Sequence, residues 1–284
     1  MVPLAYIKKA KENVLYKGKN QGLWFDLKVP EDSDAGVYSG SVSISAGGNL
    51  IAVPITLEVF DFSMPEAPAA TTTYLIWRDW LIDGELDNSI EKYKEYYDLL
   101  LEYNATAYYF PAEIGDYDGF ISCLRTYYDK VAQYGIPYVG TQYDGGKAID
   151  SEVLKSYLKA IAKASKEDEI NYFDKAYYYF DQVYDEVDAS RFAQMENTIS
   201  DTNTAEQAVI DELGLIGDIA DSVKNIRHVI PVITGWQEEF AQYKEDIVLC
   251  PIFNNFSSTD NLDLYANLQS EGYEFTSYGS ANFW

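Results

Sequence analysis

The chain has 284 residues, 47% of them hydrophobic and 15% aromatic, and its 46 acidic and 21 basic residues give a net charge of −25. No apolar run approaches the ~20 residues of a membrane span, so the composition predicts a soluble globular protein without a transmembrane segment. Acidic residues are spread over the whole length, which disfavours nucleic acid as a partner because a polyanion binds basic surfaces.

Few residues of this chain could hold a metal or activate a nucleophile. His228 is the only histidine, and Cys123 and Cys250 lie far apart, so neither a zinc site nor any cofactor is expected. A serine or cysteine nucleophile would need the single imidazole, which lies in a strand-like run where a structural role is favoured. Catalysis is therefore expected to depend on carboxylates, amides and phenols.

Residues 20–62 alternate between apolar and polar side chains in the manner of paired β-strands, with turn-forming residues at 30–36 and 46–49. The sequence predicts a small all-β sandwich domain over residues 1–64, truncated at its N-terminus, and a proline-containing linker over 65–72. The apolar residues of the alternating runs are Leu23, Phe25, Leu27, Val29, Val42, Ile44, Ile51, Val53, Ile55, Leu57 and Val59.

From residue 73 onward, short apolar runs alternate with segments of helical spacing. Strands are predicted over 73–77, 105–110, 136–142, 176–180, 228–234, 248–253 and 273–278. Helices are predicted over 90–101, with Asn88 or Ser89 as the cap, and over 120–131, 153–161 and 208–223. About seven β/α steps, without a glycine-rich phosphate loop, favour an α/β fold: a (β/α)8 TIM-like barrel over 73–284 that lacks its last β/α unit.

Barrel enzymes carry their active sites at the carboxyl ends of the strands, so the residues that follow each run are candidates. They are rich in aromatic and amide groups, which suit a sugar because rings stack on its C–H faces while amides bond its hydroxyls. An ion pair of Arg78 with Asp79 that braces the barrel mouth is favoured over direct sugar binding by these two. The candidate substrate-binding residues are Trp77, Arg78, Asp79, Gln142, Tyr143, Trp236, Asn254 and Tyr278.

Three segments of the N-terminal part form a distinctive set: QGLWFDLKVP at 21–30, AGVYSG at 35–40 and VPITLEVFDFSMP at 53–65. This set resembles the β-sandwich domain of glycoside hydrolase family 123 and of related uncharacterised bacterial families. The later part of the chain is similar too, because Val248-Leu249-Cys250-Pro251 resembles the family's sixth-strand region. The family's fourth strand typically ends in Asp-Glu followed by Pro, where this chain has Asp181-Gln182-Val183.

The resemblance implies hydrolysis of β-linked N-acetylgalactosamine with retention of configuration, in which the 2-acetamido oxygen of the substrate attacks C1. It implies that Asp181 orients the acetamide and stabilises the positive charge of the oxazolinium intermediate, and that the next residue is the general acid. Gln182 departs from this pattern because a carboxamide has no transferable proton. Losing the acid costs about 10²–10⁴-fold in rate, so weak or absent activity on natural glycosides is expected.

Three explanations of Gln182 remain: natural divergence, which is favoured slightly, a deliberate substitution, or a working acid at Glu186 or Asp185 in the following loop. Two other functions also remain, a catalytically inactive carbohydrate-binding protein and a scaffold that joins larger neighbours. For the hydrolase and for the carbohydrate-binding protein, the expected partner is a glycan. The resemblance implies a bacterial cell-surface or extracellular location, although Met1 to Leu4 run into Lys8 without the apolar segment of a signal peptide.

Overall fold

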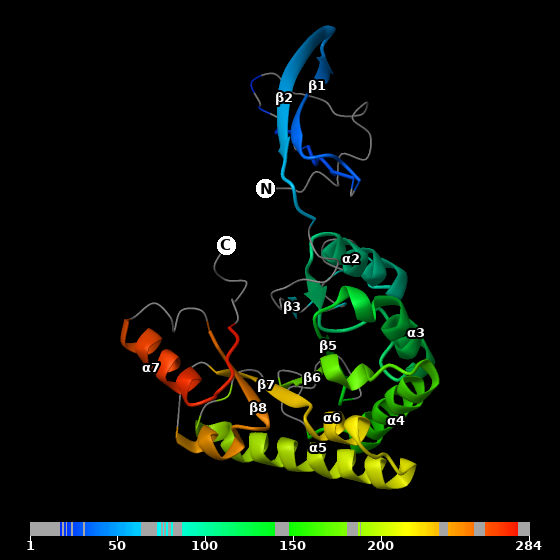
Figure 1. Ribbon diagram of the computed structural model, residues 1–284, viewed down its shortest axis with the longest axis vertical. Coiled ribbons are helices and arrows are strands. Elements are labelled where there is room, and N and C mark those ends of the chain that lie inside the picture. The colour runs from blue at the N-terminus through cyan, green and yellow to red at the C-terminus, as the bar shows by residue number, and fades with distance from the viewer. Residues whose placement is uncertain are drawn as a thin grey trace. The chain divides into compact units, whose positions relative to one another are not determined.

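The computed structural model divides into two compact units, Met1–Met64 and Pro65–Trp284 (Figure 1). It describes residues 18, 20, 22–23, 25–30, 32–63, 73–74, 76, 78, 81, 87–139, 148–180, 187, 189–232, 238–252 and 259–277. The linker predicted over 65–72 lies outside the described residues. Among the helices of the described ranges, none has the length and apolar character that crossing a membrane requires.

One antiparallel hairpin dominates the first unit, formed by β1 (Gly36–Ala46) and β2 (Asn49–Val59). Its turn is Gly47-Gly48, and the φ angles of these residues are 58° and 82°. A two-residue type I′ turn requires positive φ at both central positions, which glycine adopts without steric cost. The two strands predicted in this stretch are confirmed, with the pairing running from Ala46↔Asn49 at the turn to Gly36↔Val59.

The strand predicted over 23–29 is wrong. The described residues 25–30 have no regular structure, and Phe25 and Leu27 are 50% and 55% exposed. Alternation indicates a segment that could bury one face, but a strand also needs a neighbour whose backbone groups are free to pair. Within the described residues the first unit therefore has two strands, and a sandwich of two sheets is not observed there.

The second unit contains parallel strands that pair in the order in which they occur in the chain. One sheet has the order β3-β4 and the other β5-β6-β7-β8, and a backbone hydrogen bond of 3.2 Å from Gly135 to the carbonyl of Tyr108 joins β5 to the end of β4. Phe275 forms an isolated parallel bridge with Leu249 beyond β8. The strands are β3 (Thr73–Tyr74), β4 (Thr106–Ala107), β5 (Tyr134–Gly135), β6 (Ala176–Tyr179), β7 (Arg227–Val232) and β8 (Ile247–Pro251).

The succession of parallel strands is strongly curved. The Gln133 side chain just before β5 donates to the Thr73 hydroxyl on β3 over 3.2 Å, and both side chains lie close enough to Tyr177 on β6 to offset part of the rise that burial causes in its pKa. Strands β4 and β5 lie between β3 and β6 in the pairing order, so a flat sheet would hold Thr73 too far from Tyr177 for this contact. The strands therefore curl so that β3 approaches the inner side of β6.

Helices connect the strands and follow one another around one side of them (Figure 1). Ser89, one of the two predicted caps, caps α2 because its hydroxyl accepts a 3.2 Å bond from the Lys92 amide, and Asp150 caps α4 through the amides of Glu152 and Val153. The α-helices are α2 (Ile90–Glu102), α3 (Tyr117–Tyr127), α4 (Ser151–Asp168), α5 (Phe192–Leu213), α6 (Asp218–Lys224) and α7 (Thr259–Ser270). Short 3-10 helices are η3 (Tyr128–Lys130), η4 (Tyr172–Lys175), η6 (Ala189–Arg191) and η7 (Glu238–Tyr243).

Two predicted elements of this unit need correction. The helix predicted over 208–223 is divided, because Gly214 and Gly217 have φ angles of 57° and 62° and end one helix before the next begins. The strand predicted over 136–142 forms two residues earlier as β5, and Pro137, which has no amide hydrogen, is the second residue after its end. Helix α7 and the early start of α5 at Phe192 were missed, and Tyr273–Tyr278 contributes only the bridge at Phe275 within the described residues.

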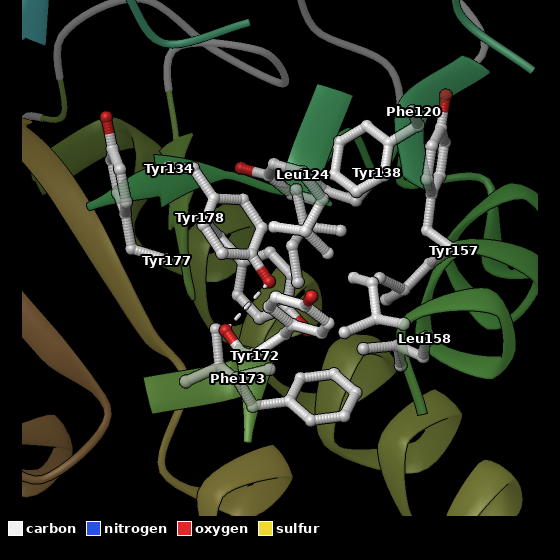
Figure 2. Close-up of a cluster of buried hydrophobic side chains, with 14 of the residues drawn as sticks. Phe120, Leu124, Tyr134, Tyr138, Tyr157, Leu158, Tyr172, Phe173, Tyr177 and Tyr178 are labelled. Carbon is white, nitrogen blue, oxygen red and sulfur yellow. Dashed lines mark hydrogen bonds between the residues drawn. The ribbon is translucent and has the colours of Figure 1, made fainter. Parts of the chain in front are cut away.

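The core of the second unit is unusually aromatic, with tyrosines from strands and helices packed edge to face (Figure 2). Tyr108 shows how closely these rings pack, because a Cβ atom on Gly135 would lie less than 2.5 Å from its ring. The Tyr108 hydroxyl donates to the carbonyl of Ile136 and accepts from the Tyr179 amide, at 3.1 and 3.2 Å. A single ring thus ties the ends of β4, β5 and β6 together.

Candidate functional site

The candidate site is the edge of the curved sheet where the parallel strands end. Strands β6, β7 and β8 end at Tyr179, Val232 and Pro251, and because they are parallel and adjacent these ends lie on the same edge. Loops that leave this edge converge, which is why enzymes with parallel sheets bind their ligands there. The segments 181–186, 233–237 and 253–258, which follow these strands in the sequence, lie outside the described residues.

Of the residues predicted to form the site, the described ranges include Arg78. Its Nη1 forms an ion pair of 2.5 Å with Glu113, and its Nε donates to the carbonyl of Asn88 over 2.9 Å. The sequence predicted a pair of Arg78 with Asp79, and Asp79 lies outside the described residues. The ion pair of Arg78 with Glu113 joins the segment after β3 to the segment after β4.

The loop after β4 is held in place by helices, and this positions Glu113. The Gly115 amide donates to the hydroxyl of Tyr157 on α4 over 2.9 Å, and Asp116 caps α3 by accepting from the Gly119 amide. Glu113 itself remains 59% exposed at its side chain, against 19% for Arg78. A pair with one partner this exposed contributes at most about 1 kcal/mol to stability.

The segment that would carry the chemistry, residues 181–186, lies outside the described residues, but both of its neighbours are placed. Phe180 and Val187 are fully buried. The Val187 amide donates to the carbonyl of Pro231 over 2.8 Å, and Val187 pairs with Val232, the last residue of β7. The chain therefore leaves and rejoins the sheet at its carboxyl edge.

Most other predicted site residues also lie outside the described residues. Those that follow β3 flank Arg78, and the others follow the strands β5 to β8 or the bridge at Phe275 in the sequence. The residues outside the described ranges are Asp181, Gln182, Asp185, Glu186, Trp77, Asp79, Gln142, Tyr143, Trp236, Asn254 and Tyr278.

Sequence reasoning missed a buried polar cluster beneath α5. Glu206 is 2% exposed, and its Oε1 accepts a 2.9 Å hydrogen bond from the hydroxyl of Tyr178 on β6. Burial raises the pKa of Glu206 to about 8, a shift that the bond from Tyr178 partly offsets and that the charge of Asp246 increases. The carboxyl group is therefore protonated at neutral pH.

His228 lies beside this cluster and has the structural role that the sequence predicted. It is 1% exposed, its ring centroid lies 4.9 Å from that of Tyr178, and burial lowers its pKa to about 3. Within the described residues neither ring nitrogen has a hydrogen-bond partner. Because Tyr178 and His228 occupy matching positions on β6 and β7 and Tyr178 reaches α5, this cluster faces the helices and is no part of the strand-end site.

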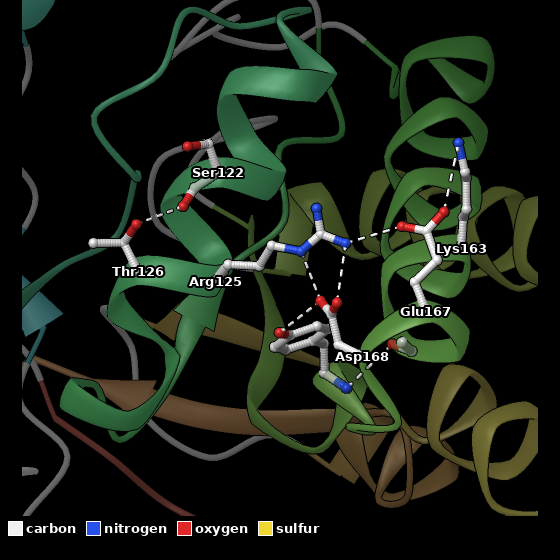
Figure 3. A network of polar contacts seen from close by, with 8 residues as sticks. Ser122, Arg125, Thr126, Lys163, Glu167 and Asp168 are labelled. Atoms are coloured by element: carbon white, nitrogen blue, oxygen red, sulfur yellow. Dashed lines mark hydrogen bonds and ion pairs between the residues drawn. The ribbon is translucent and has the colours of Figure 1, made fainter.

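A second group of charges lies on the helical side, between α3 and α4 (Figure 3). Arg125 donates from Nε to Asp168 over 2.6 Å and from Nη2 to Glu167 over 2.9 Å, and Tyr172 donates to Asp168 over 3.0 Å. The Arg125 guanidinium holds the pKa of the Asp168 carboxyl below its usual value. The geometry of this network fits a brace between two helices.

Neither a search for clusters of metal-binding side chains nor a comparison with known proteins assigns a further site or function. Among the described residues, no group of three or more His, Cys, Asp or Glu side chains could hold a metal ion. No protein-family model matches the chain, and no curated protein sequence matches it either.

Proposed function

We propose that the Pro65–Trp284 unit is a TIM-like barrel that acts on β-linked N-acetylhexosamine, most specifically N-acetylgalactosamine, as a retaining glycoside hydrolase. The observation that carries the proposal is the sequential parallel order of β3 to β8 together with their curvature, in which Tyr177 reaches Thr73. Open doubly wound sheets reverse their strand order, whereas barrels keep it. The helices on the outer side of the strands fit the same architecture (Figure 1).

In the proposed mechanism the substrate supplies the nucleophile and the protein supplies charge and orientation. The acetamide oxygen attacks C1, Asp181 holds the acetamide and stabilises its positive charge, and the leaving oxygen requires a proton. Gln182 stands where the acid belongs and can hydrogen-bond that oxygen without protonating it. Burial of both flanking residues, Phe180 and Val187, at the carboxyl edge of the sheet supports the assignment of this segment to the site.

The test compares wild type with Gln182→Glu in the release of aryl alcohol from an aryl 2-acetamido-2-deoxy-β-D-galactoside. A general acid contributes about 10²–10⁴-fold, so a gain of this size in the variant is expected. The matched control Gln182→Asn keeps an amide at the position and should stay at the wild-type rate. Equal and substantial rates in all three would move the acid to Glu186 or Asp185, and no release by any of them would reject the hydrolase.

The second candidate is a carbohydrate-binding protein on the same scaffold, and Gln182 is the observation that favours it. A binding protein should be stabilised by its ligand by RT ln(1 + [L]/Kd), which is about 2.7 kcal/mol at a hundredfold excess over Kd. Thermal unfolding with and without N-acetylgalactosamine glycosides measures this. A rise in melting temperature without product release would select this function, and an unchanged melting temperature would exclude it.

A further inference from the structure

The outer side of helix α5 carries a continuous polar stripe. The inner side of the helix is buried through residues such as Met195, Thr202 and Val209, and the helix has no lysine or arginine between its first and last residues. Polar side chains spaced by three or four residues lie on one face of a helix. On the outer face they are Glu196, Asn197, Ser200, Asn203, Thr204, Gln207 and Asp211, which are exposed or half-buried.

This stripe lines a groove of about 910 Å³. The facing wall consists of Gln242 and Tyr243 from η7 and of Asp246, which immediately precedes β8. The Asp246 carbonyl accepts a 2.9 Å bond from the amide of His228 near the start of β7, so this wall reaches the amino edge of the sheet. None of the described residues that line the groove belongs to the candidate site at the carboxyl edge.

The length of the groove distinguishes between kinds of ligand. Fifteen residues separate Glu196 from Asp211, which corresponds to about 22 Å along the helix axis. A single small cation would contact only one end of a groove of this length. An extended peptide covers the same distance with about seven residues, because a strand rises about 3.3 Å per residue.

The carboxylates at the two ends of the stripe have neutral hydrogen-bond donors. Glu196 Oε1 accepts from the hydroxyl of Tyr243 over 2.6 Å and from the amide of Gln242 over 3.3 Å. Asp211 Oδ1 accepts from the amide of Gln207 over 2.8 Å. These bonds orient the carboxylates and leave their negative charge in place.

No cation of the groove balances this charge. The described residues that line it include no lysine, arginine or histidine. The negative charge is also felt by Tyr243, because burial raises its pKa to about 12 and the bond to Glu196 and the charge of Asp246 add to the rise. A cleft lined by charges of one sign concentrates ligands of the opposite sign.

We propose that the groove binds an extended cationic peptide segment of about seven residues, whose lysine or arginine side chains pair with Glu196, Asp211 and Asp246. The amide side chains along the groove can both donate to and accept from the peptide groups of such a segment. The net charge of −25 adds long-range attraction for a cationic partner and repels an acidic one. Binding should weaken as ionic strength rises, because salt screens exposed charges.

Fluorescence anisotropy of a labelled seven-residue peptide of alternating lysine and serine, titrated with the full chain, tests the proposal. The groove variant combines Glu196→Gln with Asp211→Asn, and both new side chains keep an oxygen that accepts the existing hydrogen bonds. The control combines Asp201→Asn with Glu212→Gln, which neutralises two exposed carboxylates of the same helix that do not line the groove. Both double variants have the same net charge, so general attraction to an acidic protein affects them equally.

We expect the groove variant to bind the peptide about tenfold more weakly than wild type, since two exposed ion pairs are lost, and the control to bind as wild type does. The same peptide with glutamine in place of lysine should not bind. Equal weakening in the two variants, or no binding by wild type at low salt, would overturn the proposal. Spermine that displaces the peptide at equal charge concentration would also overturn it, because a small amine would then suffice.

A measurement on wild type alone locates the peptide without any substitution. The side-chain amide resonances of Asn203, Gln207 and Gln242 should shift when the lysine peptide is added, because all three line the groove. Binding that leaves these three resonances unchanged would place the peptide elsewhere and contradict the proposal.

Discussion

Replacing the buried Glu206 by glutamine should stabilise the protein at alkaline pH. The pKa of this carboxyl rises from 4.5 to about 8 on folding. A carboxyl group whose pKa is raised by folding stabilises the folded state fully when the pH is below its unfolded pKa. This stabilisation is lost as the pH rises from the unfolded pKa to the folded pKa. A shift of about 3.5 units corresponds to about 5 kcal/mol at 1.36 kcal/mol per unit, and the part lost between pH 5 and pH 8 is about 3–4 kcal/mol.

Glutamine has nearly the same shape as glutamic acid, keeps an oxygen to accept the bond from Tyr178, and does not ionise. Urea unfolding, followed by the helical circular dichroism signal, should give similar stabilities for wild type and Glu206→Gln at pH 5 and a gap of about 3–4 kcal/mol in favour of the variant at pH 8. The control Glu212→Gln, at an exposed position of the same helix, should change stability by about 0.5 kcal/mol or less. A constant difference between Glu206→Gln and wild type at both pH values would refute the buried neutral carboxyl.

Two further substitutions test the packing and the caps. Gly135→Ala places a methyl group against the ring of Tyr108, which is fully buried. We expect the free energy of unfolding in urea to fall by about 1–3 kcal/mol or more. A variant as stable as wild type would show that the ring can move aside. Asp150→Ala removes the side chain that caps two amides of α4 and should cost about 0.5–2 kcal/mol, whereas Ser156→Ala within the same helix should cost less, and equal losses would contradict the capping role.

Apolar spacing and capping residues in the sequence predicted those helices and strands that depend mainly on neighbouring residues. Helix α2 has the predicted apolar spacing and is capped by Ser89, and β6 occupies the apolar run that was predicted as a strand. The helix over 208–223 failed because its apolar spacing continues through Gly214 and Gly217, and Ile216, which fits the spacing, is 86% exposed. Two glycines within four residues were the available signal of the break.

Contacts distant in sequence could not be predicted in this way. Arg78 follows the first strand as expected, but its partner Glu113 depends on how the loop after β4 is anchored to α4. Glu206 has a signal in the sequence, because it occupies a position in the apolar stripe of α5 between Thr202 and Val209, both of which are buried. Its protonated state depends on burial between α5 and the sheet, which only the fold produces.

The most direct test of the proposed hydrolase compares two aryl β-D-galactosides, one with a 2-acetamido group and one with a 2-hydroxyl, as substrates of Gln182→Glu. Substrate assistance requires the acetamide oxygen as the nucleophile, so the account predicts release of aryl alcohol from the acetamido compound and a rate at least about a hundredfold lower from the hydroxyl compound. Comparable rates would show that the protein supplies its own nucleophile, and release from neither would contradict the proposed function.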